Sequence, residues 1–152
     1  MKQIYDMFNE ILVKLFRDIM DIEGKAIITE EFKDISNNDM HIIEAIGIHE
    51  KKNMSTVAKE LSVTIGTLTI AINSLVKKGY VERVRSEQDR RVVYISLTKK
   101  GEKAYRHHEE FHKKMIMATI DGLSEDEARV LVQALSNLNH FFRAMAEENK
   151  EK

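Results

Sequence analysis

Residues 54–98 constrain the fold more than any other part of the chain, because two short amphipathic patterns are followed there by two strand-like runs. The first pattern, residues 55–61, places apolar side chains at helical spacing and begins with Ser55, whose hydroxyl is the expected N-cap. Ser62 and Val63 form the predicted turn to the second pattern. The tight connection predicts two helices that pack against each other.

The second helical pattern begins after Thr64, the expected N-cap, and ends at Gly79, the expected C-terminal cap. Its apolar residues recur on one face, which leaves a narrow polar face of small side chains. Gly66 lies in the first turn, where the missing side chain lets a phosphate approach the free backbone N–H groups. A helix with these properties suits the major groove of DNA.

The two strand-like runs, residues 80–85 and 92–97, are rich in β-branched and aromatic side chains. The segment SEQDRR connects them as the tip of a hairpin. From Lys77 to Lys103 the sequence has nine basic and four acidic residues, so this stretch carries +5 although the whole chain carries −1. A basic hairpin that follows a helix-turn-helix is typical of a winged helix-turn-helix that binds nucleic acid.

The rest of the chain is predicted to be helical, since it contains no proline and only 6 glycines in 152 residues. Residues 4–23 form a long amphipathic pattern, which Gly24 is expected to end. Asp39 is the expected N-cap of a helix over residues 40–53. A further helix after residue 98 should end at Gly122, and the next segment, SEDE, supplies a capping box for the last helix.

We therefore expect a mainly α fold with a small β-hairpin wing. Residues 39–98 form the predicted winged helix-turn-helix DNA-binding domain. Residues 1–38 and 99–152 together form a predicted helical dimerisation region, because the apolar stripes of the terminal helices are wider than one small domain needs to cover.

Several classes of function are disfavoured by what the sequence lacks. It has no cysteine, which excludes disulfides, thiolate metal sites and thiol-based redox sensing. It has no glycine-rich phosphate loop and no recognised nucleophile setting, so we expect no enzymatic activity and no required cofactor. Acidic residues interrupt the N-terminal apolar pattern, which predicts neither a signal peptide nor a membrane span. We expect a cytoplasmic protein without a membrane partner.

The order of these elements, together with Asp89, Arg91, Leu97, Thr98 and Gly101, resembles the MarR family of winged-helix transcription regulators over the whole chain. Those five residues match the family's D-x-R wing and its L-T-x-x-G motif. The resemblance implies that the arginine enters the minor groove of DNA and that the aspartate holds the guanidinium in position. A guanidinium also suits the negative potential of a narrow A·T-rich minor groove.

We therefore predict a homodimer that binds double-stranded DNA at an A·T-rich palindromic operator, with one helix-turn-helix on each half-site. The predicted DNA contacts come from the two helices and the wing: Ser55, Thr64, Gly66, Thr67, Thr69, Asn73, Arg85, Ser86, Asp89, Arg90 and Arg91.

Several blocks, among them FKDIS, FHKKM and DGLSEDE, resemble the branch of the MarR family that represses fatty-acid synthesis genes. That resemblance implies a repressor whose affinity for DNA is raised by a long-chain acyl group carried on acyl carrier protein. Soft apolar side chains can accommodate such a chain, although each one alone is more typical of an ordinary core. The candidate pocket residues are Ile11, Leu15, Phe16, Ile19, Met20, Phe111 and Met115.

Three alternatives stay open. His108 and His112 are four residues apart on a predicted helix, the spacing at which two imidazoles can share a zinc ion, and His41 and Glu109 can complete such a site. Because the charged neighbours also fit a solvated helix surface, we assign no metal ligands. A second alternative is a regulator that responds to a small aromatic acid, and a third is a module that only oligomerises.

Overall fold

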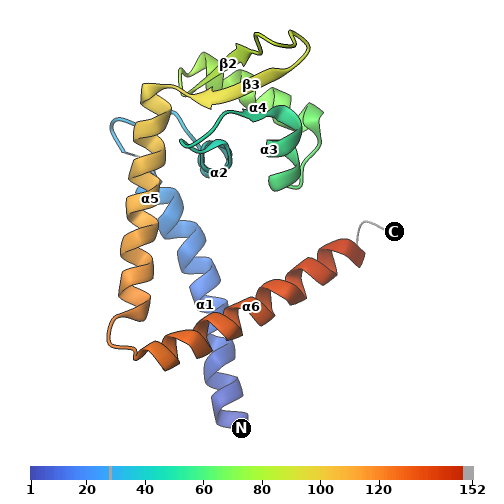
Figure 1. Ribbon diagram of the computed structural model, residues 1–152. Coiled ribbons are helices and arrows are strands. Elements are labelled where there is room, and N and C mark those ends of the chain that lie inside the picture. The colour runs from blue at the N-terminus through green and yellow to red at the C-terminus, as the bar shows by residue number, and fades with distance from the viewer. Residues whose placement is uncertain (28, 149–152) are drawn as a thin grey trace. The chain divides into compact units, whose positions relative to one another are not determined.

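The computed structural model describes residues 1–27 and 29–148, and these divide between Phe111 and His112 into two compact units (Figure 1). The fold is mainly helical with one small sheet, which confirms the predicted fold class. In chain order the elements are α1 (Lys2–Ile27), α2 (Asn37–Ile46), β1 (Lys52–Asn53), α3 (Met54–Glu60), α4 (Ile65–Lys77), β2 (Val81–Arg85), β3 (Val93–Leu97), α5 (Lys99–Ile120) and α6 (Glu125–Glu148).

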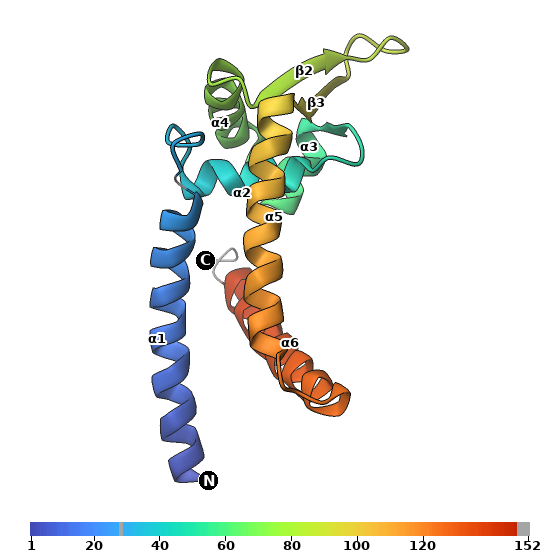
Figure 2. The ribbon, with the colours of Figure 1, turned by 90° about the vertical axis from the view of Figure 1, so that its left-hand side faces the viewer.

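The core of the first unit lies among α2, α3, α4 and the sheet (Figure 2). Met40 and Ile43 from α2 pack there with Ile72 and Leu75 from α4, and all four are completely buried. Burial of a side chain of this size contributes about 1.5–3 kcal/mol, so these contacts hold the helix-turn-helix in place. The apolar residues predicted to face inward on α4 therefore do so.

The sheet has three strands in the order β1-β3-β2, all antiparallel, whereas the sequence predicted only two. The hairpin of β2 and β3 is confirmed, with Val81 opposite Leu97 and Arg85 opposite Val93. The additional strand, β1, pairs Lys52 with Ile95 and has two residues, too few to produce an alternating pattern.

Helix α1 runs to Ile27, so the prediction that Gly24 ends it is wrong. A glycine inside a helix costs about 0.5–1 kcal/mol relative to alanine. Ile27, one turn further on, is 1% exposed, and the burial of such a side chain contributes about 1.5–3 kcal/mol. The packing of the last turn therefore outweighs the conformational cost of Gly24.

Two predicted N-caps lie at the wrong residue. Helix α2 is capped by Ser36, which accepts from the backbone N–H of Asp39, while the Asp39 carboxylate accepts from the N–H of Ser36. Asp39 is thus the third residue of a capping box. Helix α3 is capped by Asn53, whose side chain accepts from the N–H of Thr56, and Ser55 lies inside the first turn.

Helix α2 also ends earlier than predicted, at Gly47, where φ is +70°. The other helix ends agree with the sequence. The Thr64 side chain accepts from the N–H of Thr67 at the start of α4, and Gly79 and Gly122 adopt positive φ after α4 and α5. The capping box of the last helix forms between Ser124 and Glu127.

Both terminal helices expose large apolar side chains. Phe8 and Ile11 of α1 are each 58% exposed, and α6 has no buried residue. Exposed apolar stretches of this extent mark interaction surfaces. The division into a DNA-binding domain and a dimerisation region stays a prediction. None of the helices in residues 1–27 and 29–148 is both long enough and apolar enough to span a membrane.

Candidate nucleic-acid interface

The N-terminal half of α4 presents small polar side chains to solvent. The hydroxyls of Thr64 and Thr67 lie 2.9 Å apart, and both side chains are exposed. Thr69 instead donates its hydroxyl back to the carbonyl of Ile65 at 2.7 Å, which leaves its methyl group and the two lone pairs of its oxygen for an outside partner. Gly66 has no neighbour closer than 3.9 Å to the position of a Cβ, so packing inside the chain does not require a glycine there.

Asn73, near the middle of α4, is joined to the wing by a hydrogen bond. The guanidinium of Arg83 in β2 donates to the Asn73 side-chain oxygen, and both residues are exposed. The carboxamide N–H₂ of Asn73 stays available to a base edge while its oxygen is held. Arg83 was not among the predicted contacts. Its position beside α4 depends on the pairing of β2 with β3, in which Arg83 lies opposite Ile95, and the sequence alone does not give this pairing.

The wing tip is shaped by two of the predicted DNA contacts. The Ser86 hydroxyl accepts from the backbone N–H groups of Gln88 and Asp89, at 3.2 and 3.3 Å. The Asp89 carboxylate accepts from the backbone N–H of Arg91 at 3.0 Å, a contact to the main chain and not to the guanidinium as the family resemblance implied. Ser86 and Asp89 therefore fold the tip, and the exposed side chains of Arg90 and Arg91 project from it.

Several lysines of this basic region form ion pairs inside the chain, so other basic residues must supply the positive charge that attracts phosphate. Lys78 pairs with Asp39 at 2.8 Å, Lys100 with Asp34 at 3.3 Å and Lys103 with Glu31 at 3.2 Å. The first pair holds the end of α4 to α2, and the other two hold α5 to the segment between α1 and α2. The exposed guanidiniums of the wing, those of Arg85, Arg90 and Arg91, supply the field that attracts phosphate.

The L-T-x-x-G motif joins the end of the wing to the helix-turn-helix. Thr98 donates its hydroxyl to the carbonyl of Gly79 at 2.6 Å and accepts from the N–H of Gly101 at 3.2 Å. The backbone N–H of Thr98 donates to the carbonyl of Tyr80 at 3.0 Å. The motif therefore positions α4 and β3 at the start of α5, and its residues do not need to touch DNA.

Tyr80 anchors the same junction. It is completely buried and donates its hydroxyl to Asp34 at 2.5 Å, and the Lys100 ammonium lies 4.1 Å from the centre of its ring. The hydrogen bond from Tyr80 is the main cause that lowers the pKa of Asp34. Burial opposes it, and the hydrogen bond and charge of Lys100 lower the pKa further. Burial and then the Asp34 carboxylate raise the pKa of Tyr80, so the phenol stays protonated.

Two apolar side chains belong to the exposed surface of α4. Ile70 is 75% exposed and Ile65 is 51% exposed, although both lie on a helix whose opposite face is core. Apolar contact with the methyl group of thymine is one way to read an A·T pair. The exposure of Ile70 separates it from a residue at the edge of the core.

The predicted pocket residues do not enclose a cavity in the first unit. On α1, Ile11, Leu15, Phe16 and Met20 are 46–65% exposed, and only Ile19 is half-buried. Phe111 is half-buried on α5, and Met115 belongs to the second unit. These residues form apolar surface, and their role in acyl binding stays a prediction.

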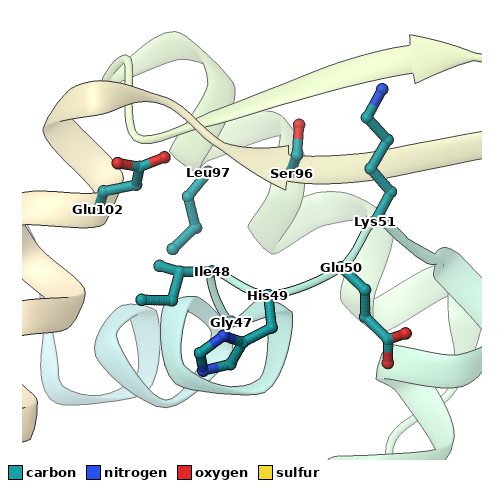
Figure 3. Close-up of a pocket in the computed structure, with 8 residues that line it drawn as sticks. All are labelled: Gly47, Ile48, His49, Glu50, Lys51, Ser96, Leu97 and Glu102. Atoms are coloured by element: carbon teal, nitrogen blue, oxygen red, sulfur yellow. The ribbon is translucent and has the colours of Figure 1, made fainter.

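A hollow of about 320 Å³ lies elsewhere, beside the loop that follows α2 (Figure 3). Leu97 points towards Ile48 on one side of it, and the remaining lining is mostly polar or charged, with Glu50, Lys51 and Glu102. A second hollow, of about 380 Å³, lies at the base of the wing tip. The charged lining of the first hollow does not suit an acyl chain.

The placement of the histidines agrees only in part with the zinc alternative. His41 and His108 come together from α2 and α5, with ring centroids 6.4 Å apart. Glu44 and Glu23 lie beside His108, whereas the predicted Glu109 is exposed and is not part of this group.

Known transcription regulators share this arrangement. Residues 25–108 match the family described as Transcriptional regulator SarA/Rot. The structure of Streptococcus pneumoniae FabT in complex with DNA superposes with a TM-score of 0.82 at 47% sequence identity, and the match covers 93% of this chain and 99% of that one.

Two further relatives are more distant. The HTH-type transcriptional regulator YpoP of Bacillus subtilis is 28% identical over 138 residues, which is 91% of this chain and 94% of YpoP. The S. aureus MepR–DNA complex superposes with a TM-score of 0.65 at 26% identity, over 86% of this chain and 94% of that one.

Proposed function

Because the chain belongs to the SarA/Rot family of transcriptional regulators and is a MarR-type winged helix-turn-helix protein similar to FabT, we propose that it represses fatty-acid synthesis genes as a DNA-binding homodimer. In this proposal the protein acts in the cytoplasm, and long-chain acyl-acyl carrier protein raises its affinity for DNA. The acyl-carrier part rests on the sequence resemblance to the fatty-acid branch of the MarR family.

The observation that carries the proposal is the pairing of an exposed helix face with an exposed basic wing. The hydrogen bond from Arg83 to Asn73 joins β2 to α4, which links the wing to the reading helix. Arg90 and Arg91 project from a tip whose backbone is held by Ser86 and Asp89. The reading helix is proposed to enter a major groove while Arg91 enters the adjacent minor groove.

Exposed apolar surface supports the homodimer. Leu135 and Phe142 of α6 are 52% and 48% exposed, and Phe8 and Ile11 of α1 are each 58% exposed. Burial of such side chains against a second copy would remove apolar area from water at about 25 cal/mol for each Å². A two-fold dimer also matches the symmetry of a palindromic operator.

The effector is proposed to bind where the apolar surface of α1 lies, at Leu15, Phe16 and neighbouring residues. A ligand that fits one spacing of the two reading helices better than another shifts the population towards that spacing. Raised affinity for DNA then requires that the favoured spacing matches successive major grooves.

Duplex binding tests the proposal directly. The full-length protein is titrated onto an A·T-rich palindrome from a fatty-acid synthesis promoter, alone, with acyl carrier protein and with its long-chain acyl form. We expect specific binding that tightens only with the acylated carrier. If specific binding has the same affinity with and without the acylated carrier, the protein is still a MarR-type regulator, but the proposed fatty-acid effector is wrong.

The wing is tested with Arg91→Ala, which should weaken specific binding by roughly 1–3 kcal/mol. Arg129→Ala is the matched control, because Arg129 is exposed and pairs only with Glu125 on its own helix among the contacts of the described residues. Unchanged operator binding by Arg91→Ala would show that the arginine does not enter the minor groove.

A further inference from the structure

Ile70 lies at the centre of the outward face of α4. Its side chain is 75% exposed, and among the large apolar side chains of the described residues only that of Met1 is more exposed. The exposed residues of this face recur at helical spacing: Gly66, Ile70, Asn73 and Lys77. The face therefore carries one large apolar side chain among small or polar neighbours.

Packing inside the chain does not account for this isoleucine. Successive residues of a helix point about 100° apart, so Ile70 points roughly 160° away from the residues two positions before and after it. Those two residues, Leu68 and Ile72, are buried in the core. The apolar area of Ile70 therefore stays in water until a group from outside the chain covers it.

The neighbours of Ile70 indicate that this outside group is DNA. Asn73 is hydrogen-bonded to Arg83 of β2, and the same strand leads to the exposed guanidiniums of the wing. An apolar protein surface placed over Ile70 would also cover Asn73 and Lys77 and leave their polar groups unpaired, which is costly. The major groove offers partners of both kinds, because base edges carry donors and acceptors and thymine adds a methyl group.

The residues around Ile70 also allow the close approach that its short side chain requires. Gly66 lies one turn before it and has no side chain, and Thr67 has a small one, so neither keeps the helix away from the base pairs. Ile70 and Asn73 are separated by about 4.5 Å along the helix axis, close to the spacing of about 3.4 Å between successive base pairs. The two side chains can therefore contact neighbouring base pairs.

We propose that Ile70 contacts the C5 methyl group of one thymine in each half-site of the operator and thereby determines part of the preferred base sequence. An isoleucine side chain forms no hydrogen bond, so it does not distinguish bases by their donors and acceptors. It favours thymine because thymine alone among the four bases presents a methyl group in the major groove. The inference rests on the proposed DNA-binding function and is independent of the acyl effector.

The test replaces thymine by deoxyuridine, which lacks only the methyl group. A duplex is first selected from a random pool with the wild-type protein, so that its choice does not depend on a fatty-acid synthesis promoter. Its thymines are then replaced in symmetric pairs, one in each half-site. Fluorescence anisotropy gives the affinity of each duplex for wild type and for Ile70→Ala. Because Ile70 is exposed and alanine favours a helix, this variant should fold, which circular dichroism verifies.

Ile65→Ala is the matched control. Ile65 is 51% exposed on the same helix, but five residues separate it from Ile70, so the two side chains point about 140° apart. The control removes the same number of apolar carbon atoms from α4 without removing those that are proposed to contact this thymine.

We expect one symmetric pair of thymines whose replacement weakens wild-type binding by about tenfold. Each lost methyl contact should weaken binding by roughly three- to fourfold, and the dimer makes two such contacts. Ile70→Ala should bind the thymine and deoxyuridine duplexes equally, whereas Ile65→Ala should retain the whole loss at that pair.

Three results would overturn the inference: no pair of thymines affects wild-type binding, the loss is the same in Ile70→Ala, or Ile65→Ala removes the loss as well. A loss that persists in Ile70→Ala would mean that the methyl group acts through the shape or stiffness of the DNA or through another residue. Specific binding without any effect of deoxyuridine rejects this inference alone. If the selection yields no preferred sequence, the proposed DNA-binding function is wrong, and the inference that rests on it is wrong too.

Discussion

The backbone carbonyl oxygen of Tyr80 lies 2.1 Å from the point where a Cβ on residue 101 would stand. Only glycine fits there, and the contact explains why the L-T-x-x-G motif ends in Gly101. We expect Gly101→Ala to lower the free energy of unfolding by about 1–3 kcal/mol, because α5 or the Tyr80 backbone has to shift. Urea unfolding followed by circular dichroism measures the change.

Gly66→Ala is the matched control, because the atom nearest to the point where a Cβ on residue 66 would stand is Thr64 Oγ1, at 3.9 Å. Its stability should stay the same or rise by up to about 1 kcal/mol, since alanine favours the helix. Operator binding should weaken, because the added methyl group lies where a phosphate is expected to approach the start of α4. Equal destabilisation of both glycine variants would contradict the steric explanation for Gly101.

The contact between Asp34 and Tyr80 predicts a dependence of stability on acid. The hydrogen bond from Tyr80 and the charge of Lys100 hold the pKa of Asp34 below its unfolded value of about 3.9. The carboxylate therefore stabilises the fold fully above that value, and this contribution is lost as pH falls through the lower pKa of the folded state. Asp34→Asn should be less stable than wild type at pH 7 by up to about 1 kcal/mol, since the carboxylate is partly exposed.

Urea midpoints of the two proteins should converge as the pH falls below about 4. A stability difference that is the same at neutral and acidic pH would show that the charge of Asp34 is not what stabilises the junction.

Tyr80 predicts the opposite dependence, in alkali. Burial and then the Asp34 carboxylate raise the pKa of the phenol above its unfolded value of about 10. The native state therefore holds its proton more tightly, and stability falls as pH rises above the unfolded value. Tyr80→Phe should be less stable near neutrality by about 1 kcal/mol for the lost hydrogen bond. Its stability should then decline less than that of wild type between about pH 9 and pH 11, as measured by urea unfolding.

Local hydrogen-bonding rules predicted several boundaries correctly. Thr64 caps α4, Gly79 and Gly122 adopt positive φ, and Ser124 forms a capping box with Glu127, because each depends on residues within one helical turn. The same rules misplaced the starts of α2 and α3, where two suitable caps lie within three residues of each other. The choice between them depends on where the preceding segment is held, as β1 holds Asn53 beside β3.

The candidate site was predictable in its outline but not in its connections. The polar face of α4 and the arginine-rich tip follow from spacing and composition alone. The link between Asn73 and Arg83 depends on strand register, and the meeting of Glu23 with His108 depends on tertiary packing of residues far apart in the chain. Sequence spacing suggested Glu109 as a ligand because it neighbours His108, yet successive helical residues point about 100° apart.

The hydrogen bond from Arg83 to Asn73 predicts that the wing and the reading helix act together in binding DNA. We expect Asn73→Ala and Arg83→Gln each to weaken operator binding, and the double variant to lose less than the two single losses combined. The shortfall should be at least about 0.5 kcal/mol, the coupling found for residues in direct contact. Fluorescence anisotropy on a labelled operator duplex gives all four affinities.

Salt dependence separates this positioning role from a direct phosphate contact. An arginine that neutralises a phosphate changes the slope of log affinity against log salt by about 1 when it is removed, whereas one that only positions Asn73 leaves the slope unchanged. We expect Arg83→Gln to keep the wild-type slope, because the guanidinium is directed towards the Asn73 oxygen. The parallel variant Arg90→Gln should reduce the slope, since Arg90 is exposed at the tip. Additive losses together with a reduced slope for Arg83→Gln would mean that Arg83 binds DNA itself and does not couple the wing to α4.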